Sequence, residues 1–234
     1  MLGELKKRVL QANLDLKTHG LIVRTWGNAS GRDSKTGLIV IKPSGVSYKS
    51  MKASDMVVID PEGKIVEGKL KPSTDAPTHL FLYKAFPSIG AIVHTHSNYA
   101  TAWAQAGKDI PALGTTHADH FYGAVPCTRQ LNAEEIKRKY EFNTGKVIVE
   151  RMGLSDPLAV PAVLVNCHGP FCWGLDPEDA VNNAIALEEI ARIAFYTVLL
   201  EKQDAIDWVL LEKHFRRKHG KNKYYGQPES KKIK

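Results

Sequence analysis

Cysteine is scarce in this sequence, with three residues among 234: Cys127, Cys167 and Cys172. Three irregularly spaced cysteines cannot build the disulfide framework of a small secreted protein, so we expect a reducing, cytoplasmic setting. Long apolar runs are also missing, since no stretch approaches the roughly 18 uninterrupted apolar residues of a membrane span. The first 16 residues carry charges between their apolar positions, which argues against a signal peptide. We therefore expect no membrane partner.

Most of the chain has no excess of basic or acidic residues, although the net charge of the whole chain is +7. Residues 213–234 contain nine Lys or Arg and one Glu, so the other 212 residues carry 23 basic and 24 acidic side chains. A protein that tracks phosphates along DNA or RNA needs basic residues clustered on a folded face. We expect no nucleic-acid partner. A basic tail is typical of a solvated end, or supplies cations to a small anionic ligand.

Glycine-rich nucleotide fingerprints are missing as well. The sequence has no P-loop and no dinucleotide-binding glycine motif, so we expect no NAD. The composition, with 43% hydrophobic and 24% charged residues, is that of an ordinary packed protein and excludes wholly disordered classes.

Apolar periodicity predicts interleaved helices and strands. We expect helices over 2–18, 76–86, 98–106, about 177–202 and about 204–218. We expect strands over 21–25, 38–41, 56–60, 89–95 and 159–166. No repeat or linker divides the chain. The pattern predicts a single α/β domain over 1–227, followed by a short basic extension at 228–234.

The most specific chemical signal is a pair of histidines, His94 and His96, at the end of a predicted strand. Residues two apart on a strand point to the same side, so both imidazoles can reach one ion. His168 follows a second apolar strand in the same way, and Asp75 precedes the helix that leads to the pair. Three imidazoles and a carboxylate suit Zn²⁺ or another divalent first-row ion. For His79 we favour a place on the helix face beside the site rather than a ligand role.

Small and hydroxyl-bearing residues occur in three loops, at 26–30, 42–45 and 72–74. Backbone N–H groups, Ser/Thr hydroxyls and a lysine are what a phosphate monoester requires. Any one of these loops alone is adequately explained as a turn, but three beside a metal site favour a phosphorylated small substrate. A further polar segment, 114–123, contains His117 and His120, which on composition alone compete with His168 for the metal.

These segments together resemble a known family. The motifs TWGNAS, IKPSGV, KPSTDAPTH, IVHTHS, GTTHADHFYG, HGPF and KHGKNKYYGQ follow the order and spacing of the class II aldolase/epimerase superfamily, and specifically of its L-ribulose-5-phosphate 4-epimerases. The resemblance covers residues 1 to 227. It implies a single-domain α/β class II aldolase-like fold, in which helices flank a central, mostly antiparallel sheet.

The resemblance also implies roles for individual residues. The metal positions match Asp75, His94, His96 and His168, and the catalytic acid/base positions match Asp119 and Tyr225. The substrate positions match Gly27, Asn28, Lys42, Ser44, Gly45, Ser73, Thr74, Thr116 and His214. A C4-symmetric homotetramer with active sites between adjacent subunits is implied too. The departures are Thr74 where a second Ser is common, His120 where an aromatic residue is common, and the added tail PESKKIK.

The implied reaction inverts C4 of L-ribulose 5-phosphate to give D-xylulose 5-phosphate. Because the C4 hydrogen is not α to the C2 carbonyl, deprotonation there is not credible, which leaves cleavage and re-formation of the C3–C4 bond with a divalent ion on the C2 and C3 oxygens. The alternative is an aldolase of the L-fuculose-phosphate type, which carries Glu at the position of Asp75. A remote alternative is a non-enzymatic, basic-tailed nucleic-acid-binding protein. The motifs leave open Zn, Mn or Co, and arabinose or ascorbate catabolism.

Overall fold

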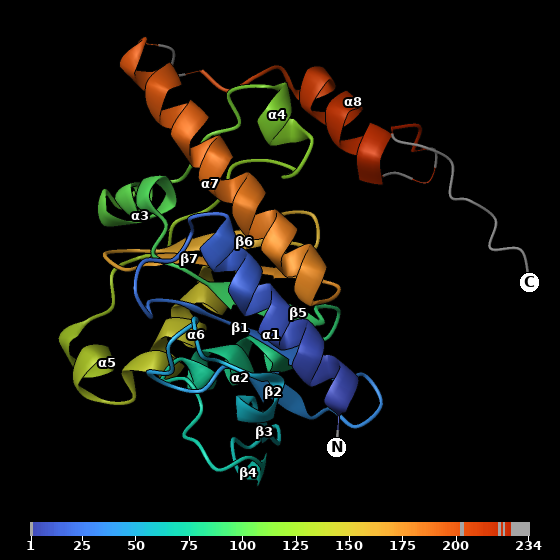
Figure 1. Ribbon diagram of the computed structural model, residues 1–234. Helices are drawn as coiled ribbons and strands as arrows, with labels where there is room; N and C mark the ends of the chain where they lie inside the picture. The colour runs from blue at the N-terminus through green and yellow to red at the C-terminus, as the bar shows by residue number, and fades with distance from the viewer. Residues whose placement is uncertain (1, 202–203, 220, 222, 226–234) are drawn as a thin grey trace, which may run out of the picture.

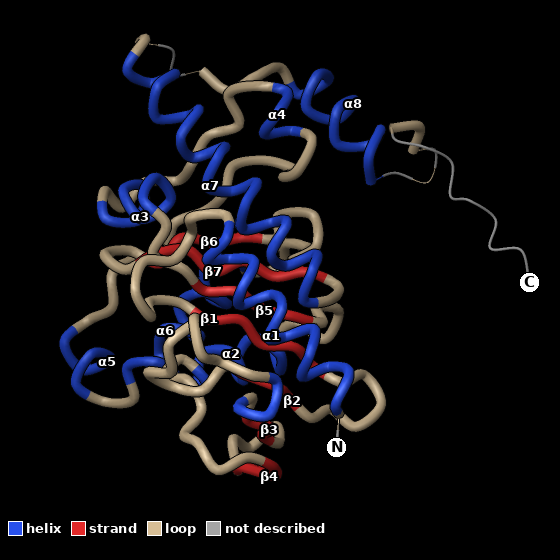
Figure 2. The backbone as a smooth tube through the Cα atoms, viewed as in Figure 1, coloured by secondary structure: helices blue, strands red, loops and turns tan. Residues whose placement is uncertain are grey.

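Seven strands form one antiparallel sheet in a computed structural model that describes residues 2–201, 204–219, 221 and 223–225 (Figure 1). Along the sheet the strand order is β4-β3-β2-β1-β5-β7-β6 (Figure 2). Their bounds are β1 Asn28–Arg32, β2 Ile39–Ile41, β3 Val57–Ile59, β4 Ile65–Glu67, β5 Ala91–His94, β6 Ala162–Val165 and β7 Gly169–Gly174. The extension expected at 228–234 lies outside the described residues.

Helices cover both faces of this sheet. The α-helices are α1 Gly3–Thr18, α2 Ala76–Ala85, α3 Asn98–Gln105, α4 Thr115–Ala118, α5 Ala133–Lys137, α6 Tyr140–Met152, α7 Pro177–Leu199 and α8 Trp208–His219. A short 3-10 helix, η1, spans Ala53–Asp55. Among the described residues, no helix combines the length and apolarity needed to cross a bilayer.

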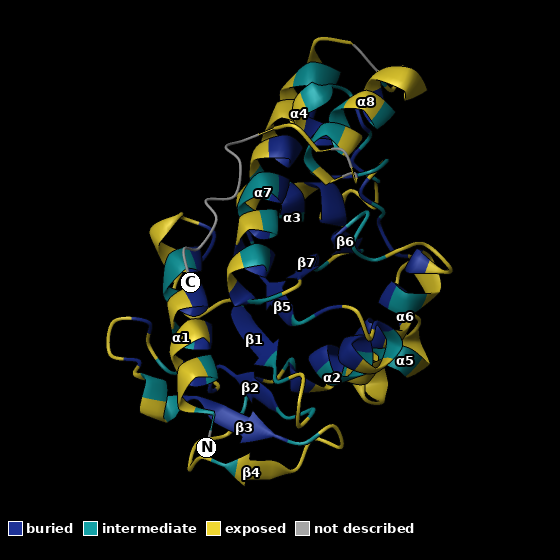
Figure 3. Cartoon of the chain, turned by 90° about the vertical axis from the view of Figure 1, so that its right-hand side faces the viewer, coloured by how far each residue is buried: buried dark blue, intermediate teal, exposed yellow. Residues whose placement is uncertain are grey.

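The sheet separates two cores, and Figure 3 shows its buried strands between α1 and α7 on one side and α2 and α6 on the other. On β2, Val40 packs into a core shared with α1, α3 and α7, whereas Ile39 and Ile41 pack into a core shared with α2 and α6. This alternation follows from the two-residue period of a strand. The expected fold class, an α/β domain with an antiparallel sheet flanked by helices, is confirmed.

One predicted strand is wrong. Residues 21–25 form turns, because Arg24 adopts a left-handed backbone conformation with φ of 56°, which no regular strand contains. Leu21 and Ile22 are nevertheless buried in the core, which is why this segment resembles a strand in sequence.

Seven elements were not predicted: the strands β1, β4 and β7, the 3-10 helix η1, and the helices α4, α5 and α6. Strand β1, Asn28–Arg32, begins inside the small-residue loop that we expected at 26–30 and extends two residues beyond it. Helix α6 contains Thr144 and Gly145 and so has weak helical propensity. Gly145 is there for packing, since a Cβ at this position would lie 2.8 Å from the Cβ of Phe81 on α2.

The sheet and α7 together fix the segment that carries the histidine pair. Strand β5 ends at His94, and α3 begins four residues later at Asn98. No side chain of α3 caps its own N-terminus. Instead, Glu188 of α7 accepts hydrogen bonds from the backbone N–H groups of Tyr99 at 2.8 Å and Ala100 at 2.9 Å. A carboxylate is favourable at a helix N-terminus, so α7 holds the end of the histidine segment in place.

We expect Glu188→Ala to lower the free energy of unfolding by about 1–2 kcal/mol, because two N–H groups of α3 lose their acceptor. Glu189→Ala is the matched control, since the exposed Glu189 pairs with Arg192 one turn along the same helix. Urea denaturation of both variants measures the difference. Equal stability of the two would show that the cap contributes nothing.

Candidate active site

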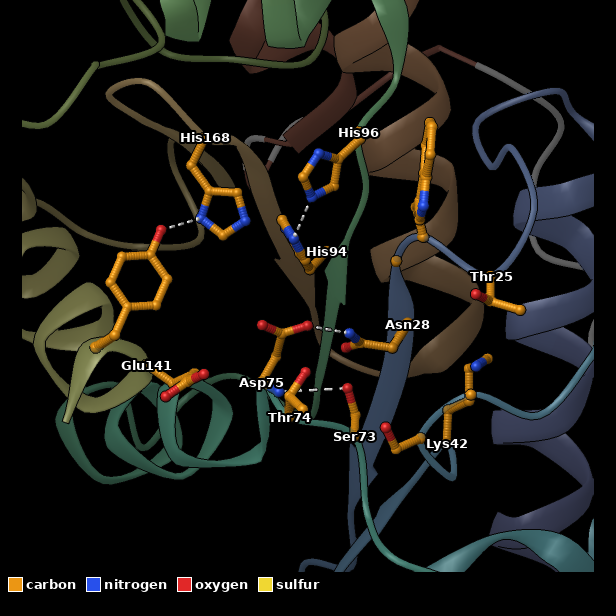
Figure 4. Close-up of a pocket in the computed structure, with 15 residues that line it drawn as sticks. Thr25, Asn28, Lys42, Ser73, Thr74, Asp75, His94, His96, Glu141 and His168 are labelled. Carbon is orange, nitrogen blue, oxygen red and sulfur yellow. Dashed lines mark hydrogen bonds between the residues drawn. The ribbon is translucent and has the colours of Figure 1, made fainter. Parts of the chain in front are cut away.

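A cavity of about 560 Å³ lies where β5 ends and β1 begins, beside the loops that precede α2 and β3 (Figure 4). Its lining residues are Thr25, Trp26, Gly27, Asn28, Lys42, Ser44, Gly45, Ser73, Thr74, Asp75, His94, His96, Tyr140, Glu141 and His168. Eleven of these are residues that the sequence analysis singled out as metal or substrate positions, which come from five separate segments of the chain.

Three imidazoles meet in this cavity. One ring nitrogen from each of His94, His96 and His168 lies within 4.8 Å of the other two, and the Nε2 atoms of His94 and His96 are 3.2 Å apart. Among the described residues, this is the one group of three or more His, Cys, Asp or Glu side chains close enough to share an ion. Nδ1 of His94 donates to the carbonyl oxygen of Pro170 at 2.9 Å, which leaves the Nε2 lone pair free for a metal.

All three imidazoles are held neutral. Burial, together with the neighbouring His96, lowers the pKa of His94 to about 3. Burial and the two other imidazoles lower the pKa of His168 to about 3, and burial lowers the pKa of His96. A metal binds the neutral form, so protons compete with a cation only under acidic conditions. The donor set therefore fits a divalent ion such as Zn²⁺.

Asp75 lies just before the first turn of α2 and faces the same cavity. The Nδ2 group of Asn28 donates to Oδ2 of Asp75 at 2.6 Å, and Figure 4 shows the two side chains pointing toward one another below the imidazoles. The register of the sheet explains the contact, because Asn28 pairs with His94 across β1 and β5. Oδ1 of Asn28 is buried and has no partner in the part of the chain that the structure describes. It is an acceptor available to a bound hydroxyl group.

The small-residue loops form the opposite wall. Backbone bonds join the loop at 42–45 to that at 72–74: Ser44 N–H donates to Lys71 O at 2.9 Å, and Ser73 N–H donates to Lys42 O at 2.9 Å. Lys42 is almost wholly buried, and burial lowers its pKa. Its Nζ donates to the carbonyl of Pro43 at 3.2 Å. Hydroxyls, N–H groups and a lysine on one wall can bind a phosphate monoester.

Four expected site residues lie outside this cavity. Thr116, Asp119, His214 and Tyr225 are not among the residues that line the cavity. Asp119 and His214 instead meet where α4 packs on α8, beyond the end of the sheet in Figure 1. His117 belongs to this region too, and its Nε2 donates to Gly123 O at 2.6 Å, so it does not compete with His168 for the metal position.

The carboxylate of Asp119 is surrounded by basic groups. Oδ1 accepts from Nδ1 of His214 at 3.1 Å and from Nε of Arg217 at 3.0 Å, and Oδ2 accepts from Nη2 of Arg217 at 2.6 Å. Nζ of Lys218 is 3.7 Å from Oδ2. Burial acts to raise the pKa of Asp119, but the bonds from Arg217 and His214 outweigh it and hold the pKa below its usual value.

Sequence reasoning gave no individual role to four residues of the cavity wall: Thr25, Trp26, Tyr140 and Glu141. Thr25 and Trp26 lie in the TWGNAS motif that the sequence analysis quoted, whereas Tyr140 and Glu141 open α6, a helix that was not predicted. The Tyr140 hydroxyl lies 3.4 Å from Nδ1 of His168 and so can orient that imidazole. The signal that could have located Tyr140 and Glu141 is the apolar spacing of Val147, Ile148 and Met152, which lie on the buried face of α6.

We expect His96→Ala to bind divalent metal much more weakly, because one of the three imidazoles is removed and only two imidazoles and one carboxylate remain. The protein should stay folded, since His96 is not part of either hydrophobic core. The affinity should fall by more than the roughly 10–100-fold that loss of a ligand's hydrogen-bond partner costs. Zn²⁺ titration calorimetry, with circular dichroism for folding, measures this. His120→Ala is the control and should bind zinc normally; if His120→Ala lost the metal instead, the assignment would be wrong.

Comparison with known proteins agrees with this fold. The family model of the class II aldolase and adducin N-terminal domain matches residues 7–195. A solved L-fuculose 1-phosphate aldolase is 26% identical, covers 90% of this chain and 94% of its own, and superposes with a TM-score of 0.76. The enzyme of that name from Thermus thermophilus is 25% identical, with coverages of 87% and 100% and a TM-score of 0.67.

A third solved structure shares the fold at lower identity. The L-fuculose 1-phosphate aldolase of Glaciozyma antarctica is 22% identical, with coverages of 92% and 81% and a TM-score of 0.74. The family match spans more than three quarters of the chain and includes β1 to β7 and every residue of the cavity wall. The chain therefore belongs to the class II aldolase and adducin N-terminal domain family.

Proposed function

We propose that this protein is a metal-dependent epimerase that interconverts L-ribulose 5-phosphate and D-xylulose 5-phosphate. The observation that carries the proposal is the short carboxylate of Asp75, which Asn28 holds on the wall of the cavity that contains the three imidazoles (Figure 4). A short side chain fixed in this way is suited to complete a metal site. The longer Glu that the aldolase pattern carries at this position could instead reach the substrate as a base.

The cavity supports a phosphorylated sugar as the substrate. Ser44, Ser73, Thr74 and the ammonium group of Lys42 hold the phosphate, and the unpartnered Oδ1 of Asn28 accepts from a sugar hydroxyl. The phosphate stays bound while the rest of the molecule reacts. A divalent ion on Asp75, His94, His96 and His168, with Zn²⁺ favoured and Mn²⁺ or Co²⁺ compatible, would act as a Lewis acid on the sugar oxygens at C2 and C3.

Asp119 and Tyr225 are the proposed acid/base pair. One of them takes the proton of the C4 hydroxyl as the C3–C4 bond breaks, and C4 becomes an aldehyde. The aldehyde fragment rotates, the bond re-forms on its other face, and the second residue returns a proton to the C4 oxygen. Two residues are needed because the hydroxyl groups of the two epimers point to opposite faces.

The separation of the cavity from Asp119 supports an active site shared between copies of the chain. We propose the homotetramer that the family resemblance implies, in which the α4–α8 end of one subunit covers the cavity of its neighbour. Exposed apolar side chains on the last turns of α7 and the first turn of α8, among them Tyr196, Leu199, Trp208 and Val209, are consistent with burial between subunits.

An aldolase is the second candidate, because two solved relatives at 25% and 26% identity carry the name L-fuculose 1-phosphate aldolase. Such an enzyme would break the same kind of bond, C3–C4 of a ketose phosphate, and release both fragments. It needs the metal cavity and one acid/base group, which takes the proton of the C4 hydroxyl and protonates the released fragment at C3. It does not need a second proton-transfer group on the opposite face.

Incubation with L-ribulose 5-phosphate distinguishes the epimerase from the aldolase. We expect the Zn²⁺-loaded protein to convert it to D-xylulose 5-phosphate, which ¹³C NMR detects directly. Unphosphorylated L-ribulose should react with a kcat/KM at least about a hundredfold lower, since the phosphate contacts hold the aldehyde during rotation.

Two results would contradict these proposals, and the first requires L-fuculose 1-phosphate as an additional substrate. Release of dihydroxyacetone phosphate from L-fuculose 1-phosphate, without inversion of L-ribulose 5-phosphate, would identify the protein as an aldolase. Comparable kcat/KM for L-ribulose and its phosphate would overturn the phosphate assignment.

A shared site predicts complementation between two inactive variants. His96→Ala removes a metal position and Asp119→Asn removes a proton-transfer group, so each homo-oligomer should be inactive. Subunits mixed by mild denaturation and refolding should recover a fraction of wild-type activity, because some interfaces then combine an intact cavity with an intact Asp119. Mixing His96→Ala with His94→Ala is the control. Recovery in the control, or none in the test mixture, would argue for a site within one chain.

A further inference from the structure

Arg217 contacts both residues of the proposed acid/base pair. Its guanidinium group binds Asp119 through two hydrogen bonds, from Nε to Oδ1 at 3.0 Å and from Nη2 to Oδ2 at 2.6 Å. Its central carbon lies 5.1 Å from the ring centroid of Tyr225. Its carbonyl oxygen accepts from the backbone N–H groups of Tyr224 at 3.0 Å and of Tyr225 at 3.1 Å.

These contacts come from two parts of one residue, the guanidinium group and the backbone carbonyl. The two-pronged bond fixes the plane of the Asp119 carboxylate, because a guanidinium group is planar and matches a carboxylate only in that orientation. The carbonyl fixes where the chain turns back after α8, and the cation attracts the face of the Tyr225 ring. Asp119 and Tyr225 are 106 positions apart in the sequence, and Arg217 contacts both. Lys218 also lies near both, with its Nζ 3.7 Å from Oδ2 of Asp119 and 4.6 Å from the Tyr225 ring centroid, but it lacks the two-pronged bond to the carboxylate.

We propose that Arg217 is a positioning residue that holds Asp119 and Tyr225 as one rigid acid/base unit. This inference rests on the proposed function, since it assigns a role to Arg217 through those two residues. Arg217 itself needs no contact with the substrate, because both prongs of its guanidinium group are occupied by Asp119.

Several charged or titratable groups face Asp119, and among the described residues Arg217 is the one whose side chain donates to both of its oxygens. From α8, His214 donates to Oδ1, Lys218 lies 3.7 Å from Oδ2, and His219 donates to the backbone carbonyl at 2.9 Å. His120 follows Asp119 directly and interacts with it through its charge. Removal of Arg217 therefore leaves some positive charge near the carboxylate but takes away its orientation.

The test compares Arg217→Met with Arg216→Met. Arg216 is the neighbouring residue on α8, is exposed, and binds Glu212 at 2.7 Å rather than Asp119. Carbon NMR of protein labelled at the aspartate carboxyl carbons, with Asp119→Asn to assign the signal, follows the titration of Asp119 without any need for activity. We expect its midpoint to rise by about one pH unit or more in Arg217→Met, as for a carboxylate that loses an adjacent arginine, and to stay unchanged in Arg216→Met.

Turnover provides the second readout. Because the ionised carboxylate is the base, the acidic limb of kcat/KM should move to higher pH in Arg217→Met, and kcat should fall about ten- to a hundredfold with little change in KM. Arg217→Lys should restore much of the titration midpoint but little of kcat, since lysine supplies the charge without the two-pronged geometry.

Double variants distinguish positioning from general stability. In an Asp119→Asn or a Tyr225→Phe background, Arg217→Met should cost much less activity than in the wild type, because its effect passes through those residues. A full additional loss in both backgrounds, or an Asp119 titration equal to that of Arg216→Met, overturns the proposal. If the wild type turns over no sugar phosphate, the proposed function fails, while the NMR titration still decides whether Arg217 controls Asp119.

Discussion

The pairing of β5 between β1 and β7 is the constraint on which the metal cavity depends. It sets His94 opposite Asn28 on one side and opposite Phe171 on the other. Phe171 stacks on the His94 imidazole at 4.2 Å between ring centroids, and Asn28 holds Asp75. A slip of one residue in this register would turn every side chain of β5 to the other face of the sheet. His94 would then enter the core on the side of α1 and α7, and the cavity would lose one of its three imidazoles.

Such a register requires close approach of neighbouring backbones at the strand ends. A Cβ at Gly27 would lie 2.6 Å from the carbonyl oxygen of His94, and the backbone φ of Gly27 is 98°. A Cβ at Gly169 would lie 2.8 Å from the carbonyl oxygen of Thr95. Both glycines flank the histidine segment, one on each side. Their lack of a side chain lets three strand ends converge closely enough for His94, His96 and His168 to meet.

The convergence of those histidines could be predicted because each histidine directly follows an apolar run that reads as a strand, and the strand repeat tells which side chains share a side. The His-x-His pair needs only the two-residue repeat of a strand, and the apolar run before His168 locates a second strand. Strand β1 could not be predicted in this way. Its sequence, NASGR, is small and polar, and it is a strand because β2 and β5 pair with both of its edges. Helix α6 likewise forms because α2 provides the surface on which Gly145 packs, a long-range contact that no local window contains.

The two groups of predicted site residues lie in different electrostatic environments. Burial keeps the three imidazoles of the cavity neutral, so that their nitrogen lone pairs are available to a cation. At Asp119, by contrast, Arg217, Lys218 and His214 surround a carboxylate and hold its pKa below its usual value. On the proposed reaction, the two environments meet only when a neighbouring subunit brings its α8 over the cavity. The substrate then lies between the cavity wall that binds its phosphate and the α8 wall that exchanges the proton of its C4 hydroxyl. Each wall belongs to a different subunit, so the charges on one do not have to be compatible with the folding of the other.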